Sequence, residues 1–226
     1  MTGVQTCALP IFAGASRPAA ATGGDYFDYL TTSDSQLALA IGDVSGHGIG
    51  PAMLMAETRA YLRILTRNRN DLSLILTRAN TMVGEDVGEE RFVTMLLAKL
   101  DPEKRTLVYA SAGHSPAFIL GSDGAVKSEL RRTGMPLGVM RDAEYTVSKP
   151  LRLAKGDVLV LLTDGLEETT NPEGELFGAD RILQAVHQNR QSKAAKIVES
   201  VFETLKDFSG NAEQVDDLTM IVAKAE

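Results

Sequence analysis

Residues 91–113 read RFVTMLLAKLDPEKRTLVYASAG and contain two β-rich runs separated by the turn DPEKR. Residues 116–130, PAFILGSDGAVKSEL, show the same pattern around Ser122-Asp123-Gly124. Two runs of strand length joined by a short turn predict an antiparallel hairpin. Hairpins outnumber strand–helix–strand units along this chain, so the sequence predicts antiparallel sheets.

Three other apolar stretches predict buried strands. Residues 36–45, QLALAIGDVS, predict a strand that ends in a glycine-rich turn. Residues 155–165, KGDVLVLLTDG, predict a strand covered on both faces and followed by an Asp-Gly turn, and residues 217–225, DLTMIVAKA, predict the final strand. The strands therefore come from most of the length of the chain.

Helices are predicted between these strands. One is expected at about residues 51–67, where Pro51 suits a first helical turn. Apolar residues at helical spacing mark a second helix from Leu72 to Val83, with Asp71 as its N-cap, and a third over residues 194–205. The expected fold is α+β, a central antiparallel β-sandwich flanked by α-helices in four layers, αββα.

Composition limits the function classes. The chain has 226 residues, of which 44% are apolar and 23% charged, as expected for one globular domain. Its net charge of −7 argues against nucleic acid or a membrane surface as a partner. A single cysteine, Cys7, and the lack of a secretory signal or long apolar run predict a cytoplasmic protein.

The N-terminus differs in character from the rest. Residues 1–15 begin MTGVQTCALPIF and have the look of a non-native or truncated junction. We therefore expect the functional domain to span residues 16–226.

Aspartates border several of the predicted apolar strands. Asp43 and Asp164 end two of them, the Asp216-Asp217 pair begins a third, and Asp25 lies in a glycine turn ahead of the first. Carboxylates gathered at one rim of a core repel one another unless a cation neutralises them. Oxygen ligands without a His or Cys cluster favour Mg²⁺ or Mn²⁺, and two such ions suit phosphoester hydrolysis.

These positions also carry a family resemblance. Six motifs occur in order: GGDYFD (23–28), GDVSGHG (42–48), AGHSP (112–116), GMPLGV (134–139), TDGLEE (163–168) and DDLT (216–219). Together they resemble the metal-dependent protein phosphatase (PPM) family, most closely its bacterial SpoIIE/RsbU-like group. The resemblance runs from about residue 16 to residue 226.

The resemblance implies hydrolysis of phosphoserine or phosphothreonine in a protein, by attack of a hydroxide bridging two Mn²⁺ or Mg²⁺ ions. It implies that Asp43 bridges the ions and acts in catalysis together with Asp164, and that the Val44 carbonyl also holds an ion. Asp25 and Asp216 complete the implied metal ligands, with Asp217 as the alternative to Asp216.

The resemblance also suggests partners. The implied substrate is a phosphorylated STAS-type anti-sigma-factor antagonist in a bacterial signalling switch. Members of the group commonly carry a sensor or receiver domain upstream, and whether this chain forms a homodimer is left open.

Other polar residues near the motifs keep two interpretations. His47 is a candidate proton donor or turn cap, although the eukaryotic motif has its histidine at the position of Ser45 here. His114 is expected to order a loop between strands near the site. Asp28, Glu167 and Glu168 are either outer acids of the site or solvated surface.

Two functions other than a phosphatase are compatible with parts of the sequence. A nucleotide-cradling loop at residues 46–50 fails on spacing, because neither G-x-x-x-x-G-K-[ST] nor G-x-G-x-x-G is present. A non-catalytic regulatory module on the same fold is the stronger alternative, although the acids Asp25, Asp43, Asp164 and Asp216 argue against it.

Overall fold

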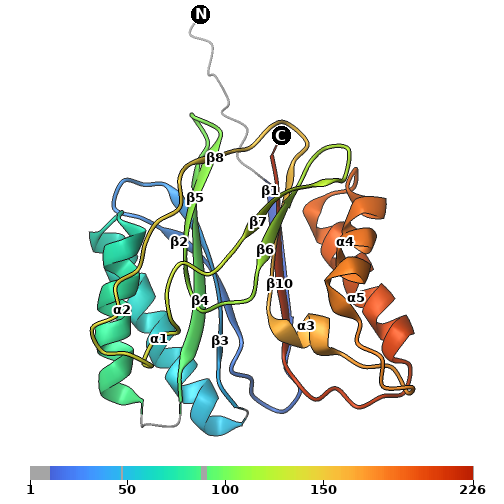
Figure 1. The fold of residues 1–226 in the computed structure, drawn as a ribbon, viewed down its shortest axis with the longest axis horizontal. Coiled ribbons are helices and arrows are strands. Elements are labelled where there is room, and N and C mark those ends of the chain that lie inside the picture. The colour runs from blue at the N-terminus through green and yellow to red at the C-terminus, as the bar shows by residue number, and fades with distance from the viewer. Residues whose placement is uncertain (1–10, 47, 88–90, 226) are drawn as a thin grey trace, which may run out of the picture.

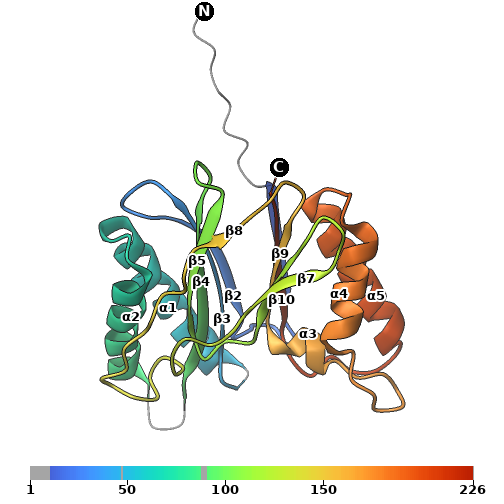
Figure 2. The ribbon, with the colours of Figure 1, turned by 45° about the horizontal axis from the view of Figure 1, so that its top comes forward.

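The computed structural model describes residues 11–46, 48–87 and 91–225, which form two five-stranded sheets packed face to face. Helices α1 (Ile49–Asn68) and α2 (Leu72–Asp86) cover one outer face, and α4 (Gly178–Asn189) and α5 (Ala194–Ser209) cover the other (Figure 1). Figure 2 shows the same order of layers from a second direction. The expected α+β sandwich with four layers is confirmed.

Each sheet combines segments that are distant in sequence. The first has the order β1-β10-β9-β6-β7 and the second β2-β3-β4-β5-β8, and neighbouring strands are antiparallel. The first sheet consists of β1 (Ile11–Arg17), β10 (Leu218–Lys224), β9 (Val158–Leu162), β6 (Ala117–Leu120) and β7 (Val126–Leu130). The second consists of β2 (Tyr26–Thr31), β3 (Leu37–Val44), β4 (Val93–Asp101), β5 (Thr106–Ala112) and β8 (Leu151–Arg152).

The central strands are apolar because both of their faces are covered. In β3, Leu39 and Ile41 belong to the core between the sheets, whereas Ala38 and Ala40 belong to the core beneath α1 and α2. Successive side chains of a strand point to opposite faces, so each residue type fits the layer it meets. All five residues of β9 are buried in the same way.

The predicted helix signals are confirmed. The carboxylate of Asp71 caps α2 by accepting hydrogen bonds from the backbone N–H groups of Ser73 at 2.8 Å and Leu74 at 3.3 Å. Helix α1 begins two residues before the expected Pro51, at Ile49. Helix α4 was not predicted from the sequence.

Two segments differ from expectation. Residues 11–15, which we placed in the junction, pair with β10 from Ile11 opposite Lys224 onward, so the domain boundary expected at residue 16 falls inside β1. This pairing joins opposite ends of the chain and has no local signature. Asp164 and Gly165 begin the short helix α3 (Asp164–Glu168) instead of forming a simple turn.

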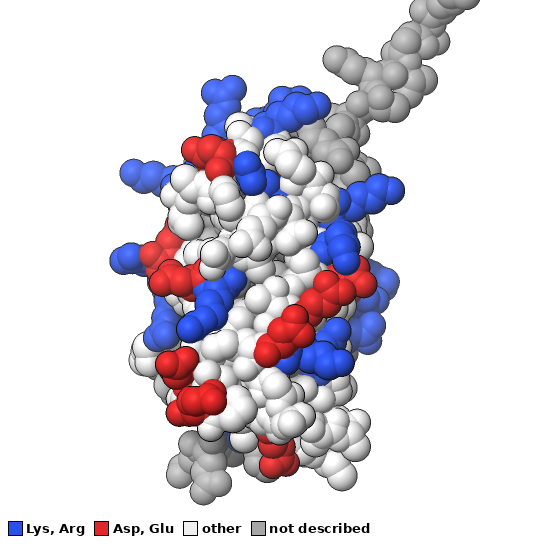
Figure 3. Space-filling model, turned by 90° about the vertical axis from the view of Figure 1, so that its right-hand side faces the viewer, with Lys and Arg blue, Asp and Glu red and all other residues white. Residues whose placement is uncertain are grey.

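The outer face of α4 and α5 carries acidic and basic side chains interspersed (Figure 3). Nζ of Lys196 on α5 lies 3.0 Å from Oε2 of Glu199 and 3.7 Å from Oε2 of Glu203. No helix in the described part of the chain combines the length and apolar character needed to cross a lipid bilayer.

Candidate metal centre

Four segments that carry the predicted acids meet at one end of the sandwich, the lower end in Figure 1 where α3 begins. Asp25 directly precedes β2, and Asp43 is the next-to-last residue of β3. Asp164 follows the end of β9, and Asp216 lies just before β10. Since β2 pairs with β3 and β9 pairs with β10 in antiparallel fashion, each pair brings its two acids to the same end.

Hydrogen bonds join the two sheets at this end. The backbone N–H of Gly24, ahead of β2, donates to Oδ2 of Asp217 at 2.7 Å. The hydroxyl of Thr163, at the end of β9, donates to Oδ2 of Asp25 at 2.8 Å. The acids of one sheet therefore face those of the other.

Gly24 has no side chain where the predicted ligands need room. A Cβ atom added to Gly24 would lie 2.9 Å from the carbonyl oxygen of Val44 and 3.4 Å from Oδ1 of Asp43. A Cβ at Gly165 would meet the carbonyl oxygen of Asp217 at 2.2 Å. Asp25, Asp43, Asp164 and Asp216 are called the carboxylate cluster below. Both glycines thus allow two segments that carry or adjoin this cluster to lie directly against each other.

The carboxylates share one electrostatic environment. Burial, together with the nearby charges of Asp25 and Asp164, raises the pKa of Asp43 to about 8. Burial raises the pKa of Asp25 and the hydroxyls of Thr219 and Thr163 lower it, with a net value of about 7. A bound cation would offset both the cost of burying these carboxylates as charged groups and their mutual repulsion.

The oxygen donors of the cluster suit hard divalent ions, but the side chains do not enclose an ion position. Its donors are carboxylate and carbonyl oxygens, the ligands that Mg²⁺ and Mn²⁺ prefer. Within residues 11–46, 48–87 and 91–225, no three His, Cys, Asp or Glu side chains already surround a single ion position. The acids are therefore gathered at one place without being closed around an ion.

Asp216 and Asp217 have different surroundings. Asp217 is buried, and its carboxylate accepts hydrogen bonds from the backbone N–H groups of Ala19 at 2.8 Å, Gly24 at 2.7 Å and Asp25 at 3.3 Å. Asp216 is exposed, and its Oδ1 accepts from the backbone N–H of Asp217 at 2.8 Å. Asp217 thus anchors the segment that leads into β2.

His114 is buried close to the cluster. Its Nδ1 lies 2.8 Å from Oγ1 of Thr94 on β4, and its Nε2 lies 3.1 Å from the carbonyl oxygen of Leu162 on β9. Burial lowers the pKa of His114 to about 4. The side chain orders the connection between β5 and β6, as expected from the sequence. His47 lies outside the described residues.

The remaining motif acids have separate environments. Asp28 is buried and binds Arg63 through two hydrogen bonds of 2.6 and 2.8 Å and the hydroxyl of Tyr26 at 2.8 Å. It therefore links β2 to α1. Glu167 is half-buried, and burial followed by the charge of Asp164 raises its pKa, whereas Glu168 is exposed.

The structure also shows groups that the sequence analysis missed. Thr163 lies in the TDGLEE motif and had no predicted role, yet its hydroxyl donates a hydrogen bond to Asp25. The guanidinium of Arg91 lies against Gly50 in the first turn of α1, where its nitrogens are 2.8 Å from the position of an added Cβ. Arg17, by contrast, stacks on Phe202, with its guanidinium carbon 4.3 Å from the ring centre.

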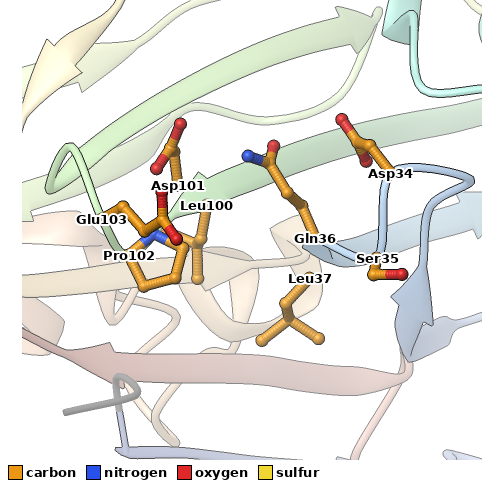
Figure 4. Close-up of a pocket in the computed structure, with 8 residues that line it drawn as sticks. All are labelled: Asp34, Ser35, Gln36, Leu37, Leu100, Asp101, Pro102 and Glu103. Carbon is orange, nitrogen blue, oxygen red and sulfur yellow. The ribbon is translucent and has the colours of Figure 1, made fainter. Parts of the chain in front are cut away.

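A small pocket adjoins the cluster. It has a volume of about 180 Å³, and Gly165, Glu168, Glu213 and Asp216 contribute to its lining. A larger pocket of about 320 Å³ lies between the β2–β3 and β4–β5 turns (Figure 4). Strand β3 separates that pocket from Asp43 by roughly 20 Å at about 3.3 Å per residue, so it is not part of the candidate site.

Two antiparallel sheets between helix layers, with acids at one end, define the class of PP2C-like folds. The PP2C domain of SiaA from Pseudomonas aeruginosa superimposes with a TM-score of 0.82 at 22% identity, covering 95% of this chain and 85% of that one. RsbX, solved in complex with magnesium, superimposes with a TM-score of 0.68 at 21% identity, covering 97% of this chain and 96% of RsbX.

The chain belongs to the SpoIIE family, described as Stage II sporulation protein E, whose pattern matches residues 33–226. It is 30% identical to the phosphoserine phosphatase RsbU of Bacillus subtilis over 212 residues, which cover 92% of this chain and 61% of RsbU. The chain spans less than two thirds of the length of the curated relatives it matches first. The family resemblance seen in the motifs is confirmed.

Proposed function

We propose that this chain is a metal-dependent protein phosphatase that hydrolyses phosphoserine or phosphothreonine. The observation that carries the proposal is the meeting of Asp25, Asp43, Asp164 and Asp216 from four separate segments at one end of the sandwich. Membership of the SpoIIE family and the name of RsbU support the reaction class.

The residues have distinct proposed roles. Asp43, whose pKa is raised by the charges of both Asp25 and Asp164, would hold Mn²⁺ or Mg²⁺ at the centre of this group of acids. The Val44 carbonyl, Asp25, Asp164 and Asp216 complete the ligands. The ions, when bound, activate a water molecule and neutralise phosphate charge.

The two acids of the DDLT motif have different proposed roles. We assign the ligand role to Asp216, because the carboxylate of Asp217 already accepts three backbone hydrogen bonds. Asp217 instead holds the segment that carries Asp25. Arg91, beside the first turn of α1, is our candidate for a contact to the substrate phosphate.

The substrate class follows from the family resemblance. We propose a phosphorylated STAS-type protein of a cytoplasmic bacterial signalling switch as the partner. Dephosphorylation of a purified STAS phosphoprotein, followed by mass spectrometry, tests this finer proposal separately from the reaction class.

The alternative is a non-catalytic regulatory module on the same fold. The open arrangement of the carboxylates is the one observation in its favour. Persistent inactivity of the intact chain with Mn²⁺ and with Mg²⁺ would support that alternative.

A matched pair of variants tests the phosphatase. Asp164 and Asp123 are both followed by glycine, but Asp123 lies exposed in the β6–β7 turn and accepts a hydrogen bond from the backbone N–H of Ala125. With p-nitrophenyl phosphate and a phosphoserine peptide, we expect Mn²⁺-dependent hydrolysis that EDTA abolishes. D164N should be inactive and D123N should match the wild type; equal activity of D164N would refute the assignment.

A further inference from the structure

His114 connects the two sheets next to the candidate metal centre without exposing either ring nitrogen. The residue is 1% exposed, and its two nitrogens contact Thr94 of the second sheet and Leu162 of the first. A histidine that exchanges protons with a substrate must reach it. The buried position of His114 therefore favours a structural role next to the site over proton transfer to a substrate.

The hydrogen-bond partners determine the tautomer. The carbonyl oxygen of Leu162 can only accept, so Nε2 of His114 must carry the proton. Burial favours the neutral ring, which leaves Nδ1 as an acceptor for the hydroxyl of Thr94. A neutral imidazole with one donor and one acceptor thus satisfies both sheets at once.

Each partner is close in sequence or register to a proposed ligand. Thr94 lies directly opposite Asp43 in the pairing of β3 with β4. Leu162 ends β9 and lies two residues before Asp164. The hydrogen bonds of His114 to Thr94 and Leu162 therefore join the backbone next to Asp43 to the backbone next to Asp164.

We propose that His114 is a positioning residue that sets the spacing of the two sheets at the carboxylate cluster, and with it the geometry in which Asp43 and Asp164 receive divalent ions. This inference rests on the proposed metal-dependent function. Groups that orient metal ligands typically change metal affinity by about 10- to 100-fold when removed.

Calorimetric titration of the intact chain with Mn²⁺ tests the proposal without any substrate. We expect H114L to weaken Mn²⁺ binding by about tenfold or more. T94V removes only the hydroxyl that bonds His114 and should weaken binding in the same direction, whereas T94S keeps the hydroxyl and should bind as the wild type does. The double variant H114L/T94V should be no weaker than H114L, because both changes break one connection.

A control separates positioning from general loss of stability. Asp157, at the opposite end of β9, is buried and pairs with Lys127. D157N should lower the unfolding temperature of the metal-free protein yet leave Mn²⁺ affinity unchanged. If H114L fails to fold, the T94V and T94S pair still decides the question.

Several results would overturn the inference. Wild-type Mn²⁺ affinity in both T94V and H114L would show that the connection does not position the ligands. Unchanged Mn²⁺ affinity in H114L with a displaced pH profile of kcat would make His114 a proton carrier instead. Mn²⁺ binding by a wild-type chain that lacks phosphatase activity would refute only the proposed function, whereas absence of Mn²⁺ binding would refute both.

Discussion

Oγ1 of Thr163 donates a 2.8 Å hydrogen bond to Oδ2 of Asp25 and so joins the end of β9 to the start of β2 across the sandwich. The same hydroxyl accepts a hydrogen bond from the backbone N–H of Thr219 at 3.1 Å. Thr163 is fully buried, so these contacts have no solvent to replace them. The hydroxyl also lowers the pKa of Asp25 relative to the value that burial alone would produce.

Replacing Thr163 with valine should therefore weaken metal binding. We expect T163V to raise the Mn²⁺ dissociation constant by about tenfold, since Asp25 loses the group that orients its carboxylate. The metal-free protein should lose about 1–3 kcal/mol of unfolding free energy, because the N–H of Thr219 loses its acceptor. Calorimetry and urea unfolding measure the two effects. T163S should restore both, and a T163V protein with wild-type values would contradict the assignment.

The raised carboxyl pKa values predict how stability depends on pH. Asp43, with a pKa of about 8 against an ordinary 3.8, holds a proton in the folded chain that the unfolded chain releases. Its contribution to stability is complete below about pH 4 and is lost as pH rises through about 8. EDTA-treated wild type should therefore lose stability between pH 6 and pH 8.5, relative to D43N.

The D43N variant provides the comparison because its side chain is neutral at every pH. It should be inactive, yet as stable as the metal-free wild type or more stable at pH 8.5. The apparent affinity of the wild type for Mn²⁺ should rise over the same pH range, because binding displaces protons. Parallel pH profiles of unfolding for the two proteins would rule out this account.

Substitutions of the two acids of the DDLT motif should have different effects on stability and on activation by Mn²⁺. D217A removes the acceptor of three backbone hydrogen bonds and should cost about 2 kcal/mol of unfolding free energy without metal. D216N should change that free energy little but abolish activation by Mn²⁺. Urea unfolding with EDTA, followed by activity against Mn²⁺ concentration, distinguishes them. The reverse pattern would make Asp217 the ligand.

Adding a methyl group at Gly24 should damage the cluster by steric contact. The new Cβ would lie 2.9 Å from the Val44 carbonyl oxygen, which must move together with the adjacent Asp43. We expect G24A to lose at least tenfold in Mn²⁺ affinity. G84A is the control, since an added Cβ there meets nothing within 4 Å in α2 and should stabilise the chain by about 0.5–1 kcal/mol. Equal Mn²⁺ binding by both variants would exclude the steric role.

Replacing Arg91 should weaken substrate binding without changing the affinity for Mn²⁺. Its guanidinium lies beside Gly50, in the helix that follows the segment bearing Asp43 and Val44. R91A should raise KM for a phosphoserine peptide several-fold at saturating Mn²⁺ while leaving calorimetric Mn²⁺ affinity unchanged. R91K should be intermediate, because lysine keeps the charge but not the planar fork. An unaltered KM in R91A would remove Arg91 from the phosphate contact.

Local patterns in the sequence predicted much of the secondary structure. Alternation and apolar runs identified β3, β9 and β10, turn residues identified the two hairpins, and Asp71 marked the start of α2. These features depend on neighbours along the chain, which is why they are readable from it. The order of the motifs was likewise sufficient to indicate the family.

Contacts between distant segments decided the rest. Asp123 and Asp164 have the same following residue, and only the burial of β9 and its pairing with β10 bring Asp164 to the cluster. Asp216 and Asp217 are adjacent in sequence, yet the chain before β2 engages the carboxylate of Asp217. Hydrogen bonds across the sandwich are satisfied only when the sheets pack, so the partners of His114 and Thr163 could not be read from local sequence.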